Sequence, residues 1–230
     1  MGFFKSLRRI GRKILPSNPV SKLLKLKPSS KKVKDISTDH RIKARIADQA
    51  YKDNRVSTIS SPDGPYEYQS QYSNRYTATY INHNIKDIII GNRGTKLTST
   101  RDLVDDARII QTDITGDDTM SKSSRVKELN NLIGRLKQSY PGYKINTTGH
   151  SLGGRVSKEV ARKNPDISHT GFNTGGFDPI GNLKDRKRDN IQEITTGNDP
   201  ISIGTRLFNP NTIVYNPKKK VFSHGIDNFL

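Results

Sequence analysis

The residues of this chain with the clearest chemical potential lie in the pentapeptide at 149–153, which reads Gly-His-Ser-Leu-Gly. Gly-x-Ser-x-Gly is the pattern of a nucleophile elbow, a sharp strand-to-helix turn that exposes a serine hydroxyl. The flanking glycines remove side chains that would collide in such a turn. With a histidine base beside it, a serine presented in this way can attack an acyl carbon. Because the pentapeptide also occurs by chance, its sequence context decides whether Ser151 is a nucleophile or an ordinary turn serine.

The segments on both sides of the pentapeptide have the pattern that an elbow requires. Residues 143–148 are rich in β-branched side chains and have an alternating pattern, and a Pro-Gly turn pair precedes them. These features predict a strand. Residues 152–163 carry apolar side chains at helical spacing, and Pro165 follows them, which predicts a helix that ends there. Strand, elbow and helix together predict an α/β-hydrolase with Ser151 as nucleophile. The backbone N–H of Leu152, the next residue, is the expected first oxyanion donor.

Five histidines are candidates for the base that the serine needs: His40, His83, His150, His169 and His224. His150 is too close to Ser151 in sequence to fold back on it, so we expect it to pack beside the turn. His40 falls in the basic N-terminal segment, His83 at a predicted hairpin tip and His169 at the start of a strand. His224 follows a short apolar stretch near the C-terminus, where a chain with the order Ser, Asp, His carries its base.

Two aspartates compete for the role of the acid that orients the base, and each is followed by Pro-Ile. Asp178 follows the strand after the nucleophile helix, and Asp199 follows the next predicted strand, residues 191–195. The proline rigidifies the loop in both cases, and either aspartate could be a simple turn residue. The spacing along the chain favours Asp199 as the acid, with Asp178 as the alternative.

The composition fits one catalytic domain. The 230 residues suffice for one well-buried domain and not for two. The absence of cysteine excludes disulfides and thiolate metal sites and fits a reducing, intracellular compartment. No metal-ligand spacing or phosphate-binding glycine loop is present, so we expect no metal and no cofactor. No apolar run approaches the length of a membrane span, and charges interrupt those near the N-terminus, which argues against a secretory signal.

The positive charge is concentrated at the N-terminus. Residues 1–45 contain 14 Lys and Arg and 2 Asp, a net charge of +12, whereas the rest of the chain has a net charge of +6. The mean hydropathy of −0.76 and the 31% share of hydrophobic residues are low for an enzyme, which suggests that part of the chain lies outside the core. We therefore expect a basic arm and linker over residues 1–45 and a catalytic domain over residues 46–230.

The beginning of the arm is amphipathic over residues 2–15. Its apolar residues follow a helical repeat, with Lys and Arg between them: Phe3, Phe4, Leu7, Ile10 and Ile14. A helix with one apolar and one cationic face binds anionic bilayers, so we expect the arm to bind a membrane surface. The first residues also match the pattern for myristoylation of Gly2. The alternatives are a solvated basic tail, an organelle-targeting peptide and a nucleic-acid contact; the last is less favoured because no recognition fold is visible.

With these features in place, the chain resembles the class 3, or fungal-type, lipase family. Residues 88–95 resemble that family's oxyanion strand, and residues 101–106 resemble the acidic segment after it. Residues 172–182 and 197–201 resemble its glycine-rich strand end and its acid loop. The resemblance extends from about Tyr51 to the C-terminus and leaves the arm outside. It implies an α/β-hydrolase with a mostly parallel central sheet flanked by helices, here with a basic N-terminal extension.

The resemblance also implies a function and a set of site residues. The function is that of a serine carboxylester hydrolase acting on lipid esters, of the lipase or phospholipase A type. Ser151, Asp199 and His224 would form its catalytic triad. Thr95 would supply the second oxyanion donor, next to Leu152.

Two stretches depart from the family pattern. Asn92 stands where the family usually has an aromatic residue, and residues 96–119 are polar, with no obvious apolar lid. The competing interpretation is a non-catalytic membrane- or nucleic-acid-binding structural protein, such as a minor virion component, that retains the fold. On the enzymatic interpretation the protein is intracellular and attached to a membrane surface; a virion or an organelle is the alternative location. The sequence leaves open phospholipid or glyceride as substrate, the acyl chain cleaved and the oligomeric state.

Overall fold

A computed structural model describes residues 31–94, 123–176, 178–199, 201–209, 211–216 and 224–230. Several sequence predictions lie outside these residues. They are the amphipathic segment 2–15 with Gly2, the oxyanion residue Thr95, the acidic segment 101–106 and the absence of an apolar lid over 96–119.

The described strands form one mixed sheet with the order β1-β9-β8-β7-β6-β5-β4-β3-β2. The strands are β1 (Lys31–Val33), β2 (Thr58–Ile59), β3 (Tyr66–Tyr68), β4 (Thr77–Asn82), β5 (Asp87–Asn92), β6 (Lys144–His150), β7 (Ser168–Phe172), β8 (Ile191–Thr196) and β9 (Ile213–Tyr215). The pairings from β1 across to β5 are parallel, and those that join β5, β4, β3 and β2 are antiparallel. The prediction of a mostly parallel central sheet is therefore confirmed.

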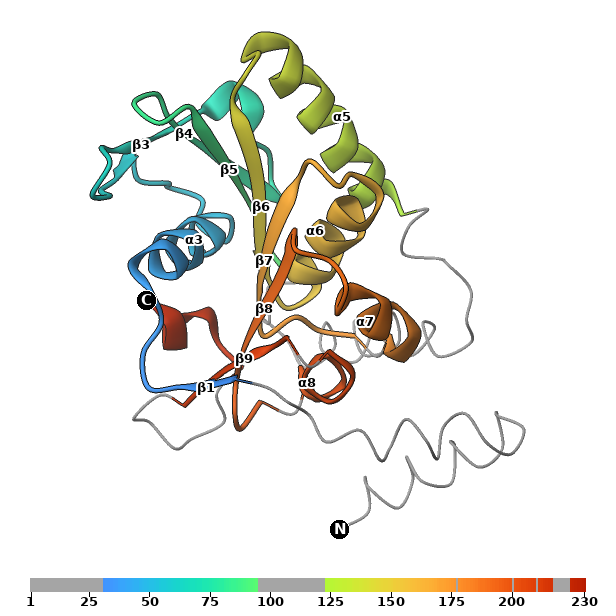
Figure 1. Ribbon diagram of the computed structural model, residues 1–230. Coiled ribbons are helices and arrows are strands. Elements are labelled where there is room, and N and C mark those ends of the chain that lie inside the picture. The colour runs from blue at the N-terminus through green and yellow to red at the C-terminus, as the bar shows by residue number, and fades with distance from the viewer. Residues whose placement is uncertain (1–30, 95–122, 177, 200, 210, 217–223) are drawn as a thin grey trace.

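Helices cover both faces of this sheet (Figure 1). They are α3 (Thr38–Gln49), α5 (Ser124–Ser139), α6 (Leu152–Lys163), α7 (Pro179–Asp185) and α8 (Ile203–Phe208), with the 3-10 turns η1 (Ser70–Tyr72) and η4 (Ile226–Phe229). Helix α3 and η4 lie on one face, whereas α5, α6 and α7 lie on the other. Helices on both faces of a largely parallel sheet make the three-layer α/β arrangement. None of the helices in the described ranges is long and apolar enough to cross a bilayer.

The largest core cluster fills the space between the sheet and helices α5 and α6. Helix α5 begins at a Ser123 cap and buries one apolar stripe, which consists of Val126, Leu129, Leu132, Ile133 and Leu136. This is the spacing of one face of a helix with 3.6 residues per turn. The stripe packs against isoleucines of β5 and valines of α6, so hydrophobic burial fixes α6, and with it the elbow, on the sheet.

The linker predicted up to residue 45 is wrong over residues 31–45. Strand β1 pairs with β9 at the edge of the sheet, and α3 packs against β4, β5 and β6. Helix α3 begins at Ser37, whose side chain accepts a hydrogen bond from the backbone N–H of His40. Its charged residues lie outside a buried face formed by Ile42, Ala44, Ile46 and Ala47. High charge thus marked a solvated helix face in this segment, not a linker.

A buried ion pair joins α6 to the sheet. The Lys158 ammonium lies 3.0 Å from the Glu193 carboxylate of β8, and neither side chain is accessible to solvent. Lys158 also donates a hydrogen bond of 2.9 Å to Asn182 of α7. Burial alone would raise the pKa of Glu193, but the adjacent Lys158 ammonium, together with His169 and Thr174, outweighs it and holds that pKa below its usual value. The pair fixes the position of α6 because separating it would leave an uncompensated buried charge.

Candidate active site

Ser151 lies on a sharp turn between the end of β6 and the start of α6. Its φ of 55° and ψ of −127° lie in a region that L-residues rarely adopt, at a cost of about 1–3 kcal/mol. Hydrogen bonds hold the turn: the Ser151 N–H donates to the Phe172 carbonyl at 3.2 Å, and the Ser151 carbonyl accepts from Gly175 at 3.2 Å. This is the strand–elbow–helix geometry that the pentapeptide predicted.

The glycines of the pentapeptide are required by close backbone contacts. A Cβ at Gly149 would lie 2.5 Å from the carbonyl carbon of Gly153. A Cβ at Gly153 would lie 2.2 Å from the Asn92 carbonyl oxygen at the end of β5. Both distances are far below van der Waals contact, so the end of β6, the start of α6 and the end of β5 can meet only where side chains are absent.

Ser151, His224 and Asp199 lie in one chain of hydrogen bonds. The Ser151 hydroxyl oxygen is 3.0 Å from Nε2 of His224, and Nδ1 of His224 is 3.1 Å from Oδ2 of Asp199. The imidazole and the carboxylate are buried, whereas Ser151 remains partly exposed. A serine, a histidine and a carboxylate in this order form an arrangement that can activate a hydroxyl as a nucleophile.

Asp199 is held as a carboxylate. Burial alone would raise its pKa, but the hydrogen bond with His224 and those from the backbone N–H groups of Ile201 and Ser202, at 3.0 Å each, keep the pKa below its usual value. An ionised carboxylate can only accept hydrogen bonds. Nδ1 of His224 therefore carries the proton, and Nε2 is free to accept the proton of the Ser151 hydroxyl.

Asp178, the alternative acid, has a different place in the fold. It precedes α7, where its side chain accepts a hydrogen bond from the backbone N–H of Gly181. Its carboxylate also pairs with Arg155 at 2.8 Å and with Arg162 at 2.6 Å, both from α6. Burial alone would raise the pKa of Asp178, but these guanidinium groups hold it well below its usual range. Asp178 thus joins α7 to α6, and it is Asp199 that contacts His224.

One oxyanion donor predicted from the sequence lies within the described residues. Leu152 is the first residue of α6, so its N–H is among those that no helical carbonyl can accept. Thr95, the second predicted donor, lies outside the described residues. The residue before it, Gly94, abuts the nucleophile: a Cβ at Gly94 would lie 3.1 Å from Cβ of Ser151. The chain therefore leaves β5 beside Ser151.

The site contains three residues to which sequence reasoning gave no functional role. His150 lies beside the turn, as predicted, but its ring also bonds to the Tyr51 hydroxyl at 2.9 Å and to the His224 carbonyl at 2.6 Å. Asn173 donates a second hydrogen bond to the same carbonyl at 2.9 Å. These partners lie far apart in sequence, so no local sequence pattern could predict their contacts.

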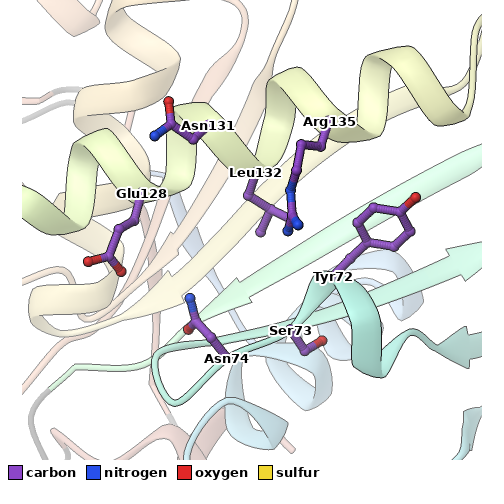
Figure 2. A pocket seen from close by; sticks show the side chains of 7 residues that line it. All are labelled: Tyr72, Ser73, Asn74, Glu128, Asn131, Leu132 and Arg135. Carbon is purple, nitrogen blue, oxygen red and sulfur yellow. The ribbon is translucent and has the colours of Figure 1, made fainter.

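Other parts of the described structure offer less chemistry. The described residues contain no group of three or more His, Asp or Glu that could hold a metal ion. A pocket of about 300 Å³ lies between the η1 segment and α5. Figure 2 shows side chains from both elements lining it, among them Tyr72, Glu128 and Arg135. Its lining includes none of Ser151, His224 and Asp199, so this pocket is separate from their chain of hydrogen bonds.

Comparisons with known proteins bear on the fold. No protein-family model matches the sequence, and no curated protein matches it significantly. Among solved structures, the Lip2 lipase of Yarrowia lipolytica matches with a TM-score of 0.52 and 18% identity, over 76% of this chain and 77% of that one. A fungal lipase matches with a TM-score of 0.50 and 16% identity, over 84% of this chain and 86% of that one. At these identities the likeness concerns the fold, and it confirms the predicted fungal-lipase type of α/β-hydrolase fold.

Proposed function

We propose that this chain is a serine carboxylester hydrolase that acts on lipid esters through a Ser151–His224–Asp199 triad. The observation that carries the proposal is the continuous hydrogen bonding from Ser151 through His224 to Asp199, at a positive-φ serine on a strand-to-helix turn. The fold shared with the Yarrowia Lip2 lipase supports lipid esters as the substrate class.

Acylation follows from the protonation states of the triad. Nε2 of His224 accepts the proton of the Ser151 hydroxyl as the oxygen forms a bond to the ester carbonyl carbon. Asp199 stabilises the resulting imidazolium and keeps the ring in the orientation that the reaction needs. The imidazolium then donates its proton to the leaving alcohol as the carbon–oxygen bond breaks, which leaves an acyl group on Ser151.

The oxyanion that forms during attack needs donors aimed at its position. We assign the backbone N–H of Leu152 as one donor, at the positive end of the α6 dipole. Thr95 is the proposed second donor, because Gly94 brings the chain beside Ser151. In the second half of the reaction His224 removes a proton from water as the water oxygen attacks the acyl carbon. The imidazolium then returns that proton to the Ser151 oxygen as the bond between Ser151 and the acyl carbon breaks, which releases the fatty acid.

We further propose that the basic arm brings the enzyme to an anionic membrane and that a phospholipid is the preferred substrate. Residues 1–30 contain 8 Lys and Arg and no acidic residue. Each basic residue near an anionic surface contributes on the order of 1 kcal/mol to membrane binding before screening. The apolar residues of segment 2–15 would add buried area in the headgroup layer. The protein would then act as a peripheral membrane enzyme.

Deleting residues 1–30, which leaves β1 and α3 intact, tests the substrate and the arm together. We expect the full chain to release fatty acid and lysophospholipid from vesicles that contain anionic phospholipid and glycerides. The deletion variant should lose salt-sensitive vesicle binding and vesicle hydrolysis but retain hydrolysis of p-nitrophenyl butyrate, because its triad is unchanged. Flotation of vesicles and mass spectrometry of the products measure both effects.

The outcomes separate the components of the proposal. Equal vesicle binding by the two proteins would show that the arm has another partner, with nucleic acid as the next candidate. Release of fatty acid from glycerides alone would overturn the phospholipid assignment. A full chain that hydrolyses neither vesicles nor the soluble ester would favour the non-catalytic structural protein.

A further inference from the structure

Tyr51 and His150 form a hydrogen-bonded pair next to the triad, and the proposed reaction does not use this pair. The Tyr51 hydroxyl is 2.9 Å from Nδ1 of His150, and it accepts a hydrogen bond of 2.7 Å from the backbone N–H of Gly94. Nε2 of His150 is 2.6 Å from the carbonyl oxygen of His224. Four residues from four separate segments are therefore joined by three consecutive hydrogen bonds.

The partners of His150 fix its protonation state. Burial of the ring, with a smaller contribution from neighbouring His224, lowers its pKa to about 3, so it stays neutral at ordinary pH. The His224 carbonyl can only accept a hydrogen bond, so Nε2 of His150 must carry the proton. Nδ1 then accepts from Tyr51, whose hydroxyl remains protonated because burial raises its pKa. The Tyr51 hydroxyl also lies 3.4 Å from the His150 carbonyl oxygen, but its contact with Nδ1, at 2.9 Å, is the shorter of the two.

The two ends of this series lie at the two parts of the site that must be aligned. At one end is Gly94, which is packed against Ser151 and precedes the proposed oxyanion residue. At the other end is the backbone of the triad base, His224, whose carbonyl is also held by Asn173. His150 itself is the residue before the nucleophile. The series therefore connects the end of β5, the elbow and the segment that carries the base.

We propose that Tyr51 and His150 are positioning residues that align the triad base with the nucleophile and the oxyanion strand. The inference rests on the proposed hydrolase function. A displacement of about 1 Å of a reacting group can lower turnover about 100-fold, and neither side chain is one of the proposed triad residues or oxyanion donors. Losing either side chain should therefore lower kcat more than it raises KM.

Four variants and one matched control test this with p-nitrophenyl butyrate. We expect Tyr51→Phe to lower kcat about 10-fold and His150→Leu to lower it about 100-fold, each with little change in KM. His150→Gln, whose amide can still donate to the His224 carbonyl, should recover most of the loss. Tyr51→Phe combined with His150→Leu should be no slower than His150→Leu alone, because both changes break one series.

Tyr80→Phe is the control, because Tyr80 is a buried tyrosine whose hydroxyl donates to the Val56 carbonyl at 2.8 Å, outside the series. It should leave kcat unchanged. Thermal unfolding of every variant shows whether a loss of rate only reflects a loss of folded protein. The inference is overturned if Tyr51→Phe retains the wild-type kcat, or if Tyr80→Phe lowers kcat to the same extent.

A second measurement does not depend on activity. In ¹⁵N-labelled protein, long-range correlation spectra assign the tautomer of each histidine ring, and we expect His150 to carry its proton on Nε2. A proton on Nδ1 would overturn the inference, even if the protein hydrolyses esters. A wild-type protein without Ser151-dependent turnover but with the expected His150 tautomer would instead remove the hydrolase function, and with it any role of the pair in catalysis.

Discussion

Replacing Ser151 by Ala is expected to lower the turnover of p-nitrophenyl butyrate by about 10⁶-fold, the loss found when the nucleophile of a serine triad is removed. The physical reason is that no other group in the described site can form the acyl intermediate. In the proposed mechanism His224 and Asp199 act as base and orienting acid for that one hydroxyl, with which they form a chain of hydrogen bonds. Release of p-nitrophenol by the purified variant, measured against the wild-type protein, gives the effect.

Ser157→Ala is the matched control for this experiment. Ser157 is a buried serine of α6, the helix that follows Ser151, and its hydroxyl donates to the Thr148 carbonyl at 3.4 Å. It should keep turnover within a few-fold of wild type, because its hydroxyl does not contact the triad. A Ser151→Ala protein that is as active as the Ser157→Ala protein would place the hydrolysis at another residue.

The second large effect is expected at Asp199. Asp199→Asn should lower kcat by about 10⁴-fold, because an amide no longer enforces the tautomer of His224 that has Nε2 free. The amide also cannot stabilise the imidazolium that forms during attack. The loss should appear in kcat with the protein still folded, since the variant replaces one oxygen by a nitrogen of nearly the same size.

Asp178→Asn is the matched control for Asp199→Asn, because both aspartates precede a Pro-Ile pair. Asp178 pairs with Arg155 and Arg162 and lies away from His224. Its variant should keep most of the turnover but lose about 1–3 kcal/mol of unfolding free energy, measured by urea denaturation. If Asp178→Asn is the inactive variant and Asp199→Asn the active one, the assignment of the acid is wrong.

The parts of the fold that the sequence predicted are those with a local signal. The elbow was predictable because a positive-φ serine between crowded backbones needs glycine at 149 and 153. The buried stripe of α5 carries a local signal of the same kind, since its five apolar residues repeat with the period of a helix. The hairpin with His83 at its tip was predictable from two β-branched runs around a polar turn, and β4 and β5 pair there.

The N-terminal boundary could not be placed by charge alone. Strand β1 has only three residues, Lys31–Val33, and is recognisable only by its pairing with β9. Helix α3 does have a local signal, since Ser37 caps it and Ile42 and Ile46 lie one turn apart. The lysines and arginines of the segment outweighed that signal, although long basic side chains are normal on a solvated helix face.

The series of hydrogen bonds from Gly94 through Tyr51 and His150 to His224 could not be predicted from any sequence pattern. Tyr51 and His150 are 99 residues apart, and His150 and His224 are 74 apart. Elimination set His150 aside as the base; in the structure its ring bonds to the Tyr51 hydroxyl and the His224 carbonyl, whereas Nε2 of His224 lies 3.0 Å from the Ser151 hydroxyl. Its role depends on where the sheet brings α3 and the C-terminal segment, which only the tertiary structure determines.

Covalent labelling of the nucleophile tests the central claim most directly. A p-nitrophenyl alkylphosphonate should phosphonylate the wild-type protein once, with release of one p-nitrophenol, because its tetrahedral phosphorus resembles the transition state of acyl transfer. Mass spectrometry of the digested protein should find the added group on Ser151. Denatured protein and the Ser151→Ala variant should remain unlabelled. An adduct on any other residue, or no adduct with the folded wild-type protein, would contradict the assignment of Ser151 as the nucleophile.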